Sequence, residues 1–438
     1  MKVQAFQLGR FLERRPEPQE ARMLGASTEL SPLMELAATL RDRGHGDVVT
    51  YSPKVFVPLT ALCRDVCHYC TFARQPRELI HTYLSESQVL EIARAGKERG
   101  CHEVLFTLGD KPELRYRAAR EALETLGFDT TAQYLAHIAG RVFDQTGLLP
   151  HINAGILEAD EMVALREVSA SQGIMLESAA HRLSERGGPH YGSPDKQPKV
   201  RLANIELAGR LKIPFTTGIL IGIGENRAER IDSLLKIRAL HDRYGHIQEL
   251  IIQPFRAKPD TLMATFPEPD TPDLLWTIAV ARILFGPDMN LQAPPNLSPG
   301  VEEKLIHAGI NDWGGVSPVT LDHVNPEAPW PRIAELQAKT HRSGKTLIPR
   351  LPVYSKYVED SAKWLSPAVS SRVHRLIDAE SWLRTDRWVP GELAEAPFSV
   401  AAVPMKKATA DLHFIFDRVI QEIDLTENDI VRLFRSRG

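Results

Sequence analysis

Cysteine is scarce in this chain, which has only four cysteines among its 438 residues. An extracellular scaffold held by disulfides would have more of them, spaced apart, so the scarcity favours a reducing cytoplasmic compartment. Long apolar runs are also lacking, and none approaches the roughly 20 residues that a membrane-spanning helix needs. The first residues are charged, unlike a secretory signal. We therefore expect a cytoplasmic protein with no membrane partner.

An excess of charge of either sign is lacking as well. The chain has 53 Lys and Arg residues against 56 Asp and Glu residues, for a formal net charge of −3. Because no basic stripe stands out, we expect no nucleic-acid partner. The hydrophobic share of 43% and the charged share of 25% are ordinary for a globular protein, and the length allows one large barrel domain with extensions.

What the sequence has is a regular alternation of apolar runs and helical patterns. One helical segment begins with Ser85 and Gln88 in a capping-box arrangement. The alternation predicts a parallel sheet with helices outside, and eight such units close a TIM-type α/β barrel; a partial, six-stranded barrel is the alternative. The eight expected strands are Val55–Leu62, Glu103–Leu108, Leu149–Asn153, Ile174–Ser178, Pro214–Gly222, Gln248–Pro254, Met289–Ala293 and Trp313–Val316.

The alternation also divides the chain. We expect an N-terminal extension over residues 1–50, the barrel over residues 51–356, and a helical C-terminal extension over residues 357–438. The last of these contains a stretch rich in Pro, Ala and Glu, Pro390–Pro397, which is typical of a linker.

Three of the four cysteines are concentrated just after the first expected strand. Cys63, Cys67 and Cys70 have C-x3-C-x2-C spacing, which supplies three thiolates to a 4Fe-4S cluster and leaves one iron open for a small molecule. The alternative is a zinc knuckle with His68 or Cys101 as fourth ligand, but structural zinc sites usually combine two close pairs, and a second pair is lacking. Cys101 opens an apolar segment and is better interpreted as a core residue.

Other polar residues also follow expected strands. Gly109 and Asp110 come after the second strand, Glu177 ends the fourth, and the segment Gln253–Arg256 ends the sixth. Because parallel barrels carry their chemistry at the carboxyl ends of the strands, these residues and the cysteines are expected on one rim.

The cysteine spacing, with Tyr69 directly before the last cysteine, resembles the radical S-adenosylmethionine (SAM) superfamily. The resemblance implies a 4Fe-4S cluster on the three thiolates, with SAM chelating the open iron and being cleaved to methionine and a 5′-deoxyadenosyl radical. Among the implied SAM contacts, Gly109 and Asp110 face the amino group and Arg201 binds the carboxylate. The full implied set is Tyr69, Gly109, Asp110, Glu177, Arg201 and Gly222.

Longer strings narrow the resemblance to the deazaflavin-forming synthases of that superfamily, over about Tyr51 to Lys356. Such an enzyme is a lyase that converts 5-amino-5-(4-hydroxybenzyl)-6-(D-ribitylimino)-5,6-dihydrouracil to 7,8-didemethyl-8-hydroxy-5-deazariboflavin with loss of ammonia, in factor 420 coenzyme biosynthesis. The resembling strings are Leu108–Glu113, Ile213–Glu225, Gln253–Arg256, Ala293–Leu297 and Asn311–Pro318.

The resemblance further implies two partners and a neutral substrate. The partners are a companion radical SAM enzyme, the 5-amino-6-(D-ribitylamino)uracil–tyrosine 4-hydroxyphenyl transferase, and a low-potential electron donor such as a ferredoxin or flavodoxin. A substrate without phosphate fits neutral polar groups, so we expect contacts from Gln253, Arg256 and Asn296. The tail Leu425–Gly438 resembles the start of the companion half in fused synthases, so the chain is expected to be, or to descend from, half of a fusion.

Two other kinds of function remain as alternatives. One is different radical SAM chemistry, such as a menaquinone-pathway cyclisation or biotin-synthase-like sulfur insertion, although insertion usually needs further cysteines and only Cys101 is available. The other is a non-enzymatic zinc-binding or iron-sensing module.

Overall fold

A computed structural model describes residues 8–27, 29–385 and 410–436. The chain divides into two compact units, Met1–Arg384 and Thr385–Gly438. The predicted linker Pro390–Pro397 lies outside the described residues. In the second unit, α16 (Ala410–Ile420) and α17 (Glu427–Arg435) are joined by an ion pair of 3.6 Å between Arg418 and Asp429. A search of the described helices for a stretch long and apolar enough to cross a membrane finds none.

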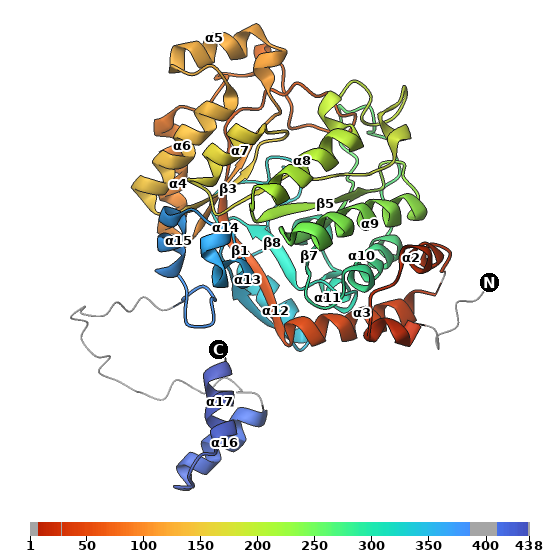
Figure 1. Ribbon diagram of the computed structural model, residues 1–438, viewed down its shortest axis with the longest axis vertical. Coiled ribbons are helices and arrows are strands. Elements are labelled where there is room, and N and C mark those ends of the chain that lie inside the picture. Colours follow the sequence, from red (N-terminus) through yellow and green to blue (C-terminus); the bar gives the residue numbers. More distant parts are fainter. Residues whose placement is uncertain (1–7, 28, 386–409, 437–438) are drawn as a thin grey trace. The chain divides into compact units, whose positions relative to one another are not determined.

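The first unit is built around a closed barrel of eight parallel strands (Figure 1). Each strand pairs with the next along the chain, and the first strand also pairs with the eighth, which closes the ring. This confirms the predicted TIM-type α/β barrel and excludes the six-stranded alternative. The strands are β1 (Val48–Pro58), β2 (Glu103–Thr107), β3 (Leu149–Asn153), β4 (Ser171–Gly173), β5 (Phe215–Ile221), β6 (Ile247–Pro254), β7 (Asn290–Gln292) and β8 (Asp312–Val316).

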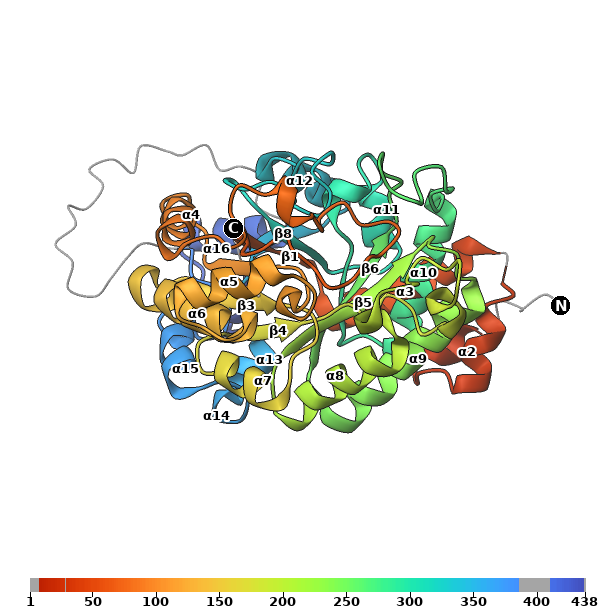
Figure 2. The ribbon, with the colours of Figure 1, turned by 90° about the horizontal axis from the view of Figure 1, so that it is seen from above.

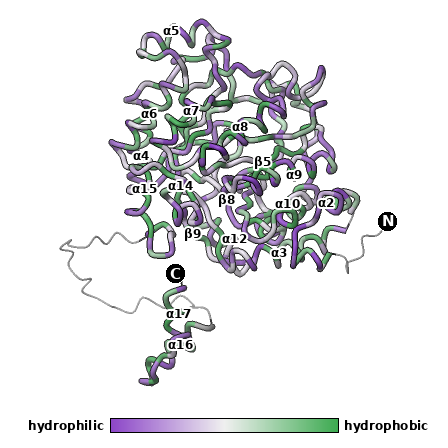
Figure 3. Tube along the Cα trace, in the orientation of Figure 1, coloured by the Kyte–Doolittle hydropathy of each residue, from purple (hydrophilic) through white to green (hydrophobic). Residues whose placement is uncertain are grey.

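Helices surround these strands (Figure 2). Their traces alternate between hydrophilic and hydrophobic residues (Figure 3), as expected of helices with one face on the barrel and the other in solvent. The main helices of the first unit are α2 (Pro18–Leu24), α3 (Leu30–His45), α4 (Glu86–Glu98), α5 (Arg117–Leu126), α6 (Thr131–Thr146), α7 (Ala159–Arg166), α8 (Pro198–Arg210), α9 (Arg227–Tyr244), α10 (Thr271–Phe285), α11 (Glu302–His307), α12 (Ile333–Arg342), α13 (Ser355–Glu359), α14 (Ser361–Trp364) and α15 (Pro367–His374).

The helix α4 illustrates how local sequence sets these elements. Ser85 accepts a hydrogen bond from the main-chain N–H of Gln88, whose side chain accepts one from Ser85 N–H, so the predicted capping box forms. Val89 and Ala93 are buried on the face toward the barrel. Gly96 allows the closest approach, because a Cβ there would lie 2.5 Å from Val55.

Two strands differ from their predicted bounds. The strand β1 begins at Val48 and ends at Pro58, so the predicted strand Val55–Leu62 was placed too late. The predicted strand Ile174–Ser178 was also misplaced, because the short polar segment Ser171–Gly173 pairs with β3 and β5, whereas the apolar run after it lies in the loop. In both cases the strand was predicted at the more apolar segment, whereas the segment that forms hydrogen bonds with neighbouring strands lies earlier in the chain.

A ninth strand, β9 (Thr346–Pro349), had no counterpart in the prediction. It pairs with the first half of β1, below the segment of β1 that pairs with β2. Helices α13 to α15 then follow and enclose a second apolar cluster that includes Tyr357 and Trp364. The predicted boundary at residue 50 therefore falls within β1, and the predicted boundary at residue 356 falls within α13.

Candidate active site

The cysteine loop leaves β1 at the carboxyl end of the barrel and is tied to three other loops. The main-chain N–H of Arg64 donates to the carbonyl of Asp110 at 2.8 Å, after β2. The N–H of His68 donates to Pro189 at 2.9 Å, after β4, and its carbonyl accepts from Met263 at 3.3 Å, after β6. The loop conformation is thus fixed by the barrel rather than by its own sequence alone.

The three thiols of this loop are unpaired and half-buried. The sulfur of Cys63 accepts a hydrogen bond from the N–H of Asp110 at 3.2 Å, and that of Cys67 lies 3.5 Å from the hydroxyl of Ser193. Burial raises the pKa of Cys63 to about 12 and that of Cys67 to about 11. Thiolates at these positions therefore require a nearby cationic centre, as a bound metal provides.

The donor set fits an iron-sulfur cluster better than a single metal ion. A tetrahedral zinc ion with Zn–S bonds of about 2.3 Å holds its sulfurs roughly 3.8 Å apart. The sulfur atoms of the three described thiols do not all lie within 4.8 Å of one another. A cube-shaped cluster instead binds each thiolate through a different iron. Cys101 lies just before β2, at the opposite end of the barrel, and is 2% exposed in the main core.

Asp110 offers an open acceptor beside the cysteine loop. One carboxylate oxygen accepts from the N–H of Ile156 at 3.0 Å, while the other is buried and has no hydrogen-bond partner. Burial, reinforced by the nearby charge of Asp195, raises the pKa of Asp110 to about 7. Gly155 makes room for this carboxylate, because a Cβ there would lie 2.4 Å from it. Such an unsatisfied buried oxygen fits the amino group of a ligand.

Basic residues balance the acidic groups around the loop. Asp65, Asp110 and Asp195 offer carboxylate oxygens that lie within 4.8 Å of one another. The guanidinium of Arg64 forms a two-pronged ion pair with Asp195, with one contact of 2.7 Å. Arg201 donates to the main-chain carbonyl of Asp195 at 2.8 Å. These ion pairs and hydrogen bonds hold the segment after β4 against the cysteine loop.

The remaining predicted SAM contacts lie around the same loop. Gly109 is in close contact with it, because a Cβ at this position would be 2.7 Å from the Cβ of Cys63. Glu177 has a left-handed backbone with φ of 64° and forms an ion pair of 2.5 Å with Lys196. The hydroxyl of Tyr69 lies 3.0 Å from the imidazole of His190.

Two of the predicted SAM contacts are committed to structural roles. Arg201 donates to the carbonyls of Asp195 and Met175, each at 2.8 Å, so much of its guanidinium binds main chain. Gly222 follows β5 with φ of 91°, and a Cβ there would lie 2.5 Å from Pro269. Leu220 and Ile223, on either side of Gly222, pack in the same apolar cluster as Tyr69, which places this turn next to the cysteine loop.

The three predicted substrate contacts are not brought together. Gln253, on β6, lines a cavity of about 170 Å³ inside the barrel. Arg256 and Asn296 instead line a separate pocket near the surface. Arg256 forms an ion pair of 2.5 Å with Glu268, and Asn296 donates to Asp322 at 2.9 Å, so both side chains already serve the loops.

The barrel cavity has polar walls that sequence reasoning missed. Strands β1, β2, β3 and β7 contribute Lys54, Glu103, Asn153 and Gln292 to its lining. Lys54 and Glu103 form an ion pair of 2.6 Å. The search for polar residues considered the ends of the first, second, fourth and sixth strands and passed over Asn153 and Gln292, which end β3 and β7; Lys54 lies within β1 and Glu103 begins β2. The alternation of polar with apolar residues, as in Ser52 and Lys54 with Pro53 and Val55, was the available signal.

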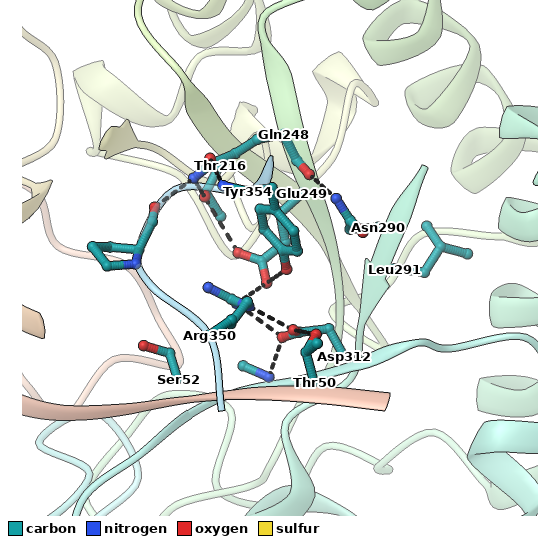
Figure 4. Close-up of polar contacts among 12 residues, drawn as sticks. Thr50, Ser52, Thr216, Gln248, Glu249, Asn290, Leu291, Asp312, Arg350 and Tyr354 are labelled. Carbon is teal, nitrogen blue, oxygen red and sulfur yellow. Dashed lines mark hydrogen bonds and ion pairs between the residues drawn. The ribbon is translucent and has the colours of Figure 1, made fainter. Parts of the chain in front are cut away.

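The floor of the cavity is a buried ionic network centred on Arg350 (Figure 4). Its guanidinium contacts Asp312 at 2.6 Å and Glu249 at 2.7 Å, and Glu249 also accepts from the hydroxyl of Tyr354 at 2.9 Å. Arg350 is almost fully buried, and its ion pairs with these two carboxylates offset the cost of burying its charge. The guanidinium in turn keeps the pKa of Asp312 below its usual range, although burial alone would raise it. Thr50 donates to Asp312 and completes the floor.

Comparison with known proteins is consistent with this arrangement. Residues 57–237 match the radical SAM superfamily. Two solved structures share the fold. The FeFe-hydrogenase maturase HydG from Carboxydothermus hydrogenoformans has a TM-score of 0.65 and 17% identity, and the match covers 80% of this chain and 79% of that one. Methylornithine synthase (PylB) has a TM-score of 0.62 and 18% identity, and the match covers 81% of this chain and 99% of that one. The barrel and its three-thiol loop are thus those of a radical SAM domain.

Similarity to curated proteins narrows the assignment from the superfamily to one family. The chain is 50% identical to the 7,8-didemethyl-8-hydroxy-5-deazariboflavin synthase of Methanopyrus kandleri over 337 residues, which cover 77% of this chain and 100% of that protein. It is 49% identical to the FO synthase of Mycobacterium tuberculosis over 396 residues, or 87% of this chain and 46% of that protein. The chain therefore belongs to the 7,8-didemethyl-8-hydroxy-5-deazariboflavin synthase family of radical SAM proteins. It spans about half the length of the FO synthases that it matches.

Proposed function

We propose that this chain is a radical SAM lyase that converts 5-amino-5-(4-hydroxybenzyl)-6-(D-ribitylimino)-5,6-dihydrouracil to 7,8-didemethyl-8-hydroxy-5-deazariboflavin with loss of ammonia. The observation that carries the proposal is the match to the Methanopyrus kandleri synthase, which extends over the whole of that protein at 50% identity. The same match favours this reaction over sulfur insertion and over a metal-binding module without activity.

In this proposal the cysteine loop holds the cofactor. Cys63, Cys67 and Cys70 ligate a 4Fe-4S cluster, and their three thiolates leave one iron for SAM. Reductive cleavage of bound SAM supplies a 5′-deoxyadenosyl radical for hydrogen-atom removal from the substrate. The protein contributes position, and it excludes water, because the loop lies over a barrel whose interior is closed at the floor by the Arg350 network.

The residues around the loop orient SAM. The unsatisfied oxygen of Asp110 accepts from the amino group, and Gly109 permits the close approach. Glu177, held by its ion pair to Lys196, is a further acidic contact of the set. Arg201 acts mainly by holding the main chain of Met175 and Asp195, which makes it a positioning residue. Tyr69 and Gly222 complete the predicted set.

Two partners follow from the reaction. Reductive cleavage of SAM would require one electron, so a bound cluster would need a low-potential ferredoxin or flavodoxin as its reductant. The adduct must be made by a second enzyme that joins a tyrosine-derived 4-hydroxybenzyl group to 5-amino-6-(D-ribitylamino)uracil, and we propose the companion radical SAM transferase as its source.

The test is product analysis under anaerobic conditions. The protein is reconstituted with iron and sulfide, then mixed with the companion transferase, tyrosine, 5-amino-6-(D-ribitylamino)uracil, SAM and dithionite. Mass spectrometry should detect 7,8-didemethyl-8-hydroxy-5-deazariboflavin and 5′-deoxyadenosine. The Cys67→Ala protein is the control: it should yield no deazaflavin in the mixture, and it should yield no 5′-deoxyadenosine when incubated with SAM and dithionite without the transferase. If the unaltered protein alone forms 5′-deoxyadenosine but the mixture yields no deazaflavin, SAM cleavage is supported and the assigned substrate is contradicted.

A further inference from the structure

Three side-chain amides inside the barrel have no hydrogen-bond partner. Asn153 on β3, Gln253 on β6 and Gln292 on β7 all line the central cavity. Within the described part of the chain, none of these three carboxamides forms a hydrogen bond or ion pair. Each therefore presents an N–H donor and a carbonyl acceptor to the cavity.

The other polar side chains of the cavity wall are already committed. Lys54 is paired with Glu103 at 2.6 Å, and His151 lies 2.6 Å from the hydroxyl of Ser171. Gln248 donates to the carbonyl of Pro352 at 3.0 Å. Because polar groups in a protein interior are normally satisfied, the three uncommitted amides in one cavity indicate a ligand that satisfies them.

The cations of the cavity wall are all paired with carboxylates. Lys54 is paired with Glu103, and Arg350 is paired with both Asp312 and Glu249. No cation among the described residues of the cavity wall is left over for a phosphate or carboxylate. The cavity therefore suits a ligand that has no anionic group and offers several hydrogen-bonding groups.

The cavity lining also has an aromatic and apolar part. Phe56 stacks on Trp330 with a ring separation of 5.0 Å and an angle of 13° between the planes. Leu105 and Ile251 also line the cavity. Gly314 on β8 lets the amide of Gln292 pack against the strand, because a Cβ on Gly314 would lie 2.0 Å from the amide nitrogen. A ligand with one polar heterocyclic edge and one aromatic ring matches these two kinds of lining.

We propose that Asn153, Gln253 and Gln292 bind the pyrimidine-dione edge of the substrate. That edge presents carbonyl, N–H and carbonyl in sequence, and carboxamides supply both the donors and the acceptor that it needs. The wall of Phe56 and Trp330 receives the phenol ring of the hydroxybenzyl group. This assignment rests on the proposed function, and it replaces Arg256 and Asn296 as substrate contacts.

The test combines binding and kinetics. Asn153→Leu, Gln253→Leu and Gln292→Leu remove the amides at nearly constant volume, and Gln19→Leu, which alters an exposed amide on α2, is the matched control. Isothermal titration calorimetry uses the product 7,8-didemethyl-8-hydroxy-5-deazariboflavin, which keeps the dione edge. Each cavity variant should bind it about tenfold more weakly, the loss expected when one hydrogen bond to a buried polar group is removed. The control should bind as the unaltered protein does.

A structural defect is distinguished by a second readout. Formation of 5′-deoxyadenosine from SAM in the absence of substrate should be unchanged in the three variants, because that reaction does not use the amides. Product affinity and KM within twofold of the unaltered protein in all three variants would overturn the assignment while the proposed function stands. If the unaltered protein makes no deazaflavin from the adduct and does not bind the product, both the function and the assignment fail.

Discussion

Replacement of Arg350 by Met gives the most demanding test of the barrel floor. The guanidinium of Arg350 bridges Asp312 at 2.6 Å and Glu249 at 2.7 Å, and all three side chains are almost fully buried. Arg350→Met keeps the length of the side chain but leaves two buried carboxylates without a cation. Removing one partner of such a buried pair typically costs about 3–5 kcal/mol of unfolding free energy.

The assay is urea unfolding followed by circular dichroism at pH 7.5. Arg342→Met is the matched control, because Arg342 forms an ion pair of the same kind with Glu303 at 2.7 Å but on the surface. Breaking the surface pair should change stability by less than about 1 kcal/mol. A triple variant with Asn and Gln in place of Asp312 and Glu249 should recover most of the stability lost in Arg350→Met, because no uncompensated charge remains.

The pH dependence gives an independent check. Without Arg350, burial raises the pKa of Asp312 in the folded protein above its value in the unfolded chain. Between these two pKa values the folded protein keeps a proton on Asp312 that the unfolded chain has released. The cost of the substitution should then shrink as the pH falls from 8 to 5. A loss below about 1 kcal/mol at pH 7.5, or a loss that does not vary over this pH range, would refute the reasoning, because the floor would not depend on this cation.

Three further predictions concern the loop and the floor. Cys67→Ala should abolish SAM cleavage but leave the urea midpoint nearly unchanged, whereas Cys101→Ala should retain most activity; equal losses in the two would contradict the ligand assignment. Gly109→Ala should lower bound iron about tenfold, because its Cβ would collide with the carbonyl of Leu62; normal iron content by colorimetric assay would disprove this. Burial raises the pKa of Glu249 to about 7, so stability should fall as the pH rises from about 5 to 7, and Glu249→Gln should remove that fall in pH-dependent unfolding; an unaltered profile would exclude Glu249 as its source.

The sequence predicted the fold where pattern and pairing agree. Six of the eight strands have their predicted positions to within about two residues, because an apolar run between turn signals coincides there with the paired segment. The strand β4 was missed because only Ser171–Gly173 pairs, and such a short polar segment has no periodicity to detect. The strand β9 was missed because it is short and follows a turn that shows no apolar alternation.

The candidate site was predictable to the extent that it is local in sequence. The three cysteines and Asp110 follow directly from motif spacing and strand ends, and the structure brings them together. Asn153 and Gln292 also end strands, but their significance depends on which way each side chain faces and on its lack of a hydrogen-bond partner, which the sequence does not show. Arg256 and Asn296 lie on the expected rim, but their side chains bind Glu268 and Asp322. These partners belong to loops, and the spacing of residues in the sequence does not predict such contacts.

The tethering of the cysteine loop has a consequence for biogenesis. Its three anchoring hydrogen bonds come from loops that leave separate strands far along the polypeptide. A nascent chain that has emerged only as far as the cysteines lacks those anchors, so it holds the thiols in no fixed arrangement. If the proposed cluster is bound, we expect delivery of iron and sulfide to follow synthesis of the later strands, when the ring has closed and the ligands are already spaced.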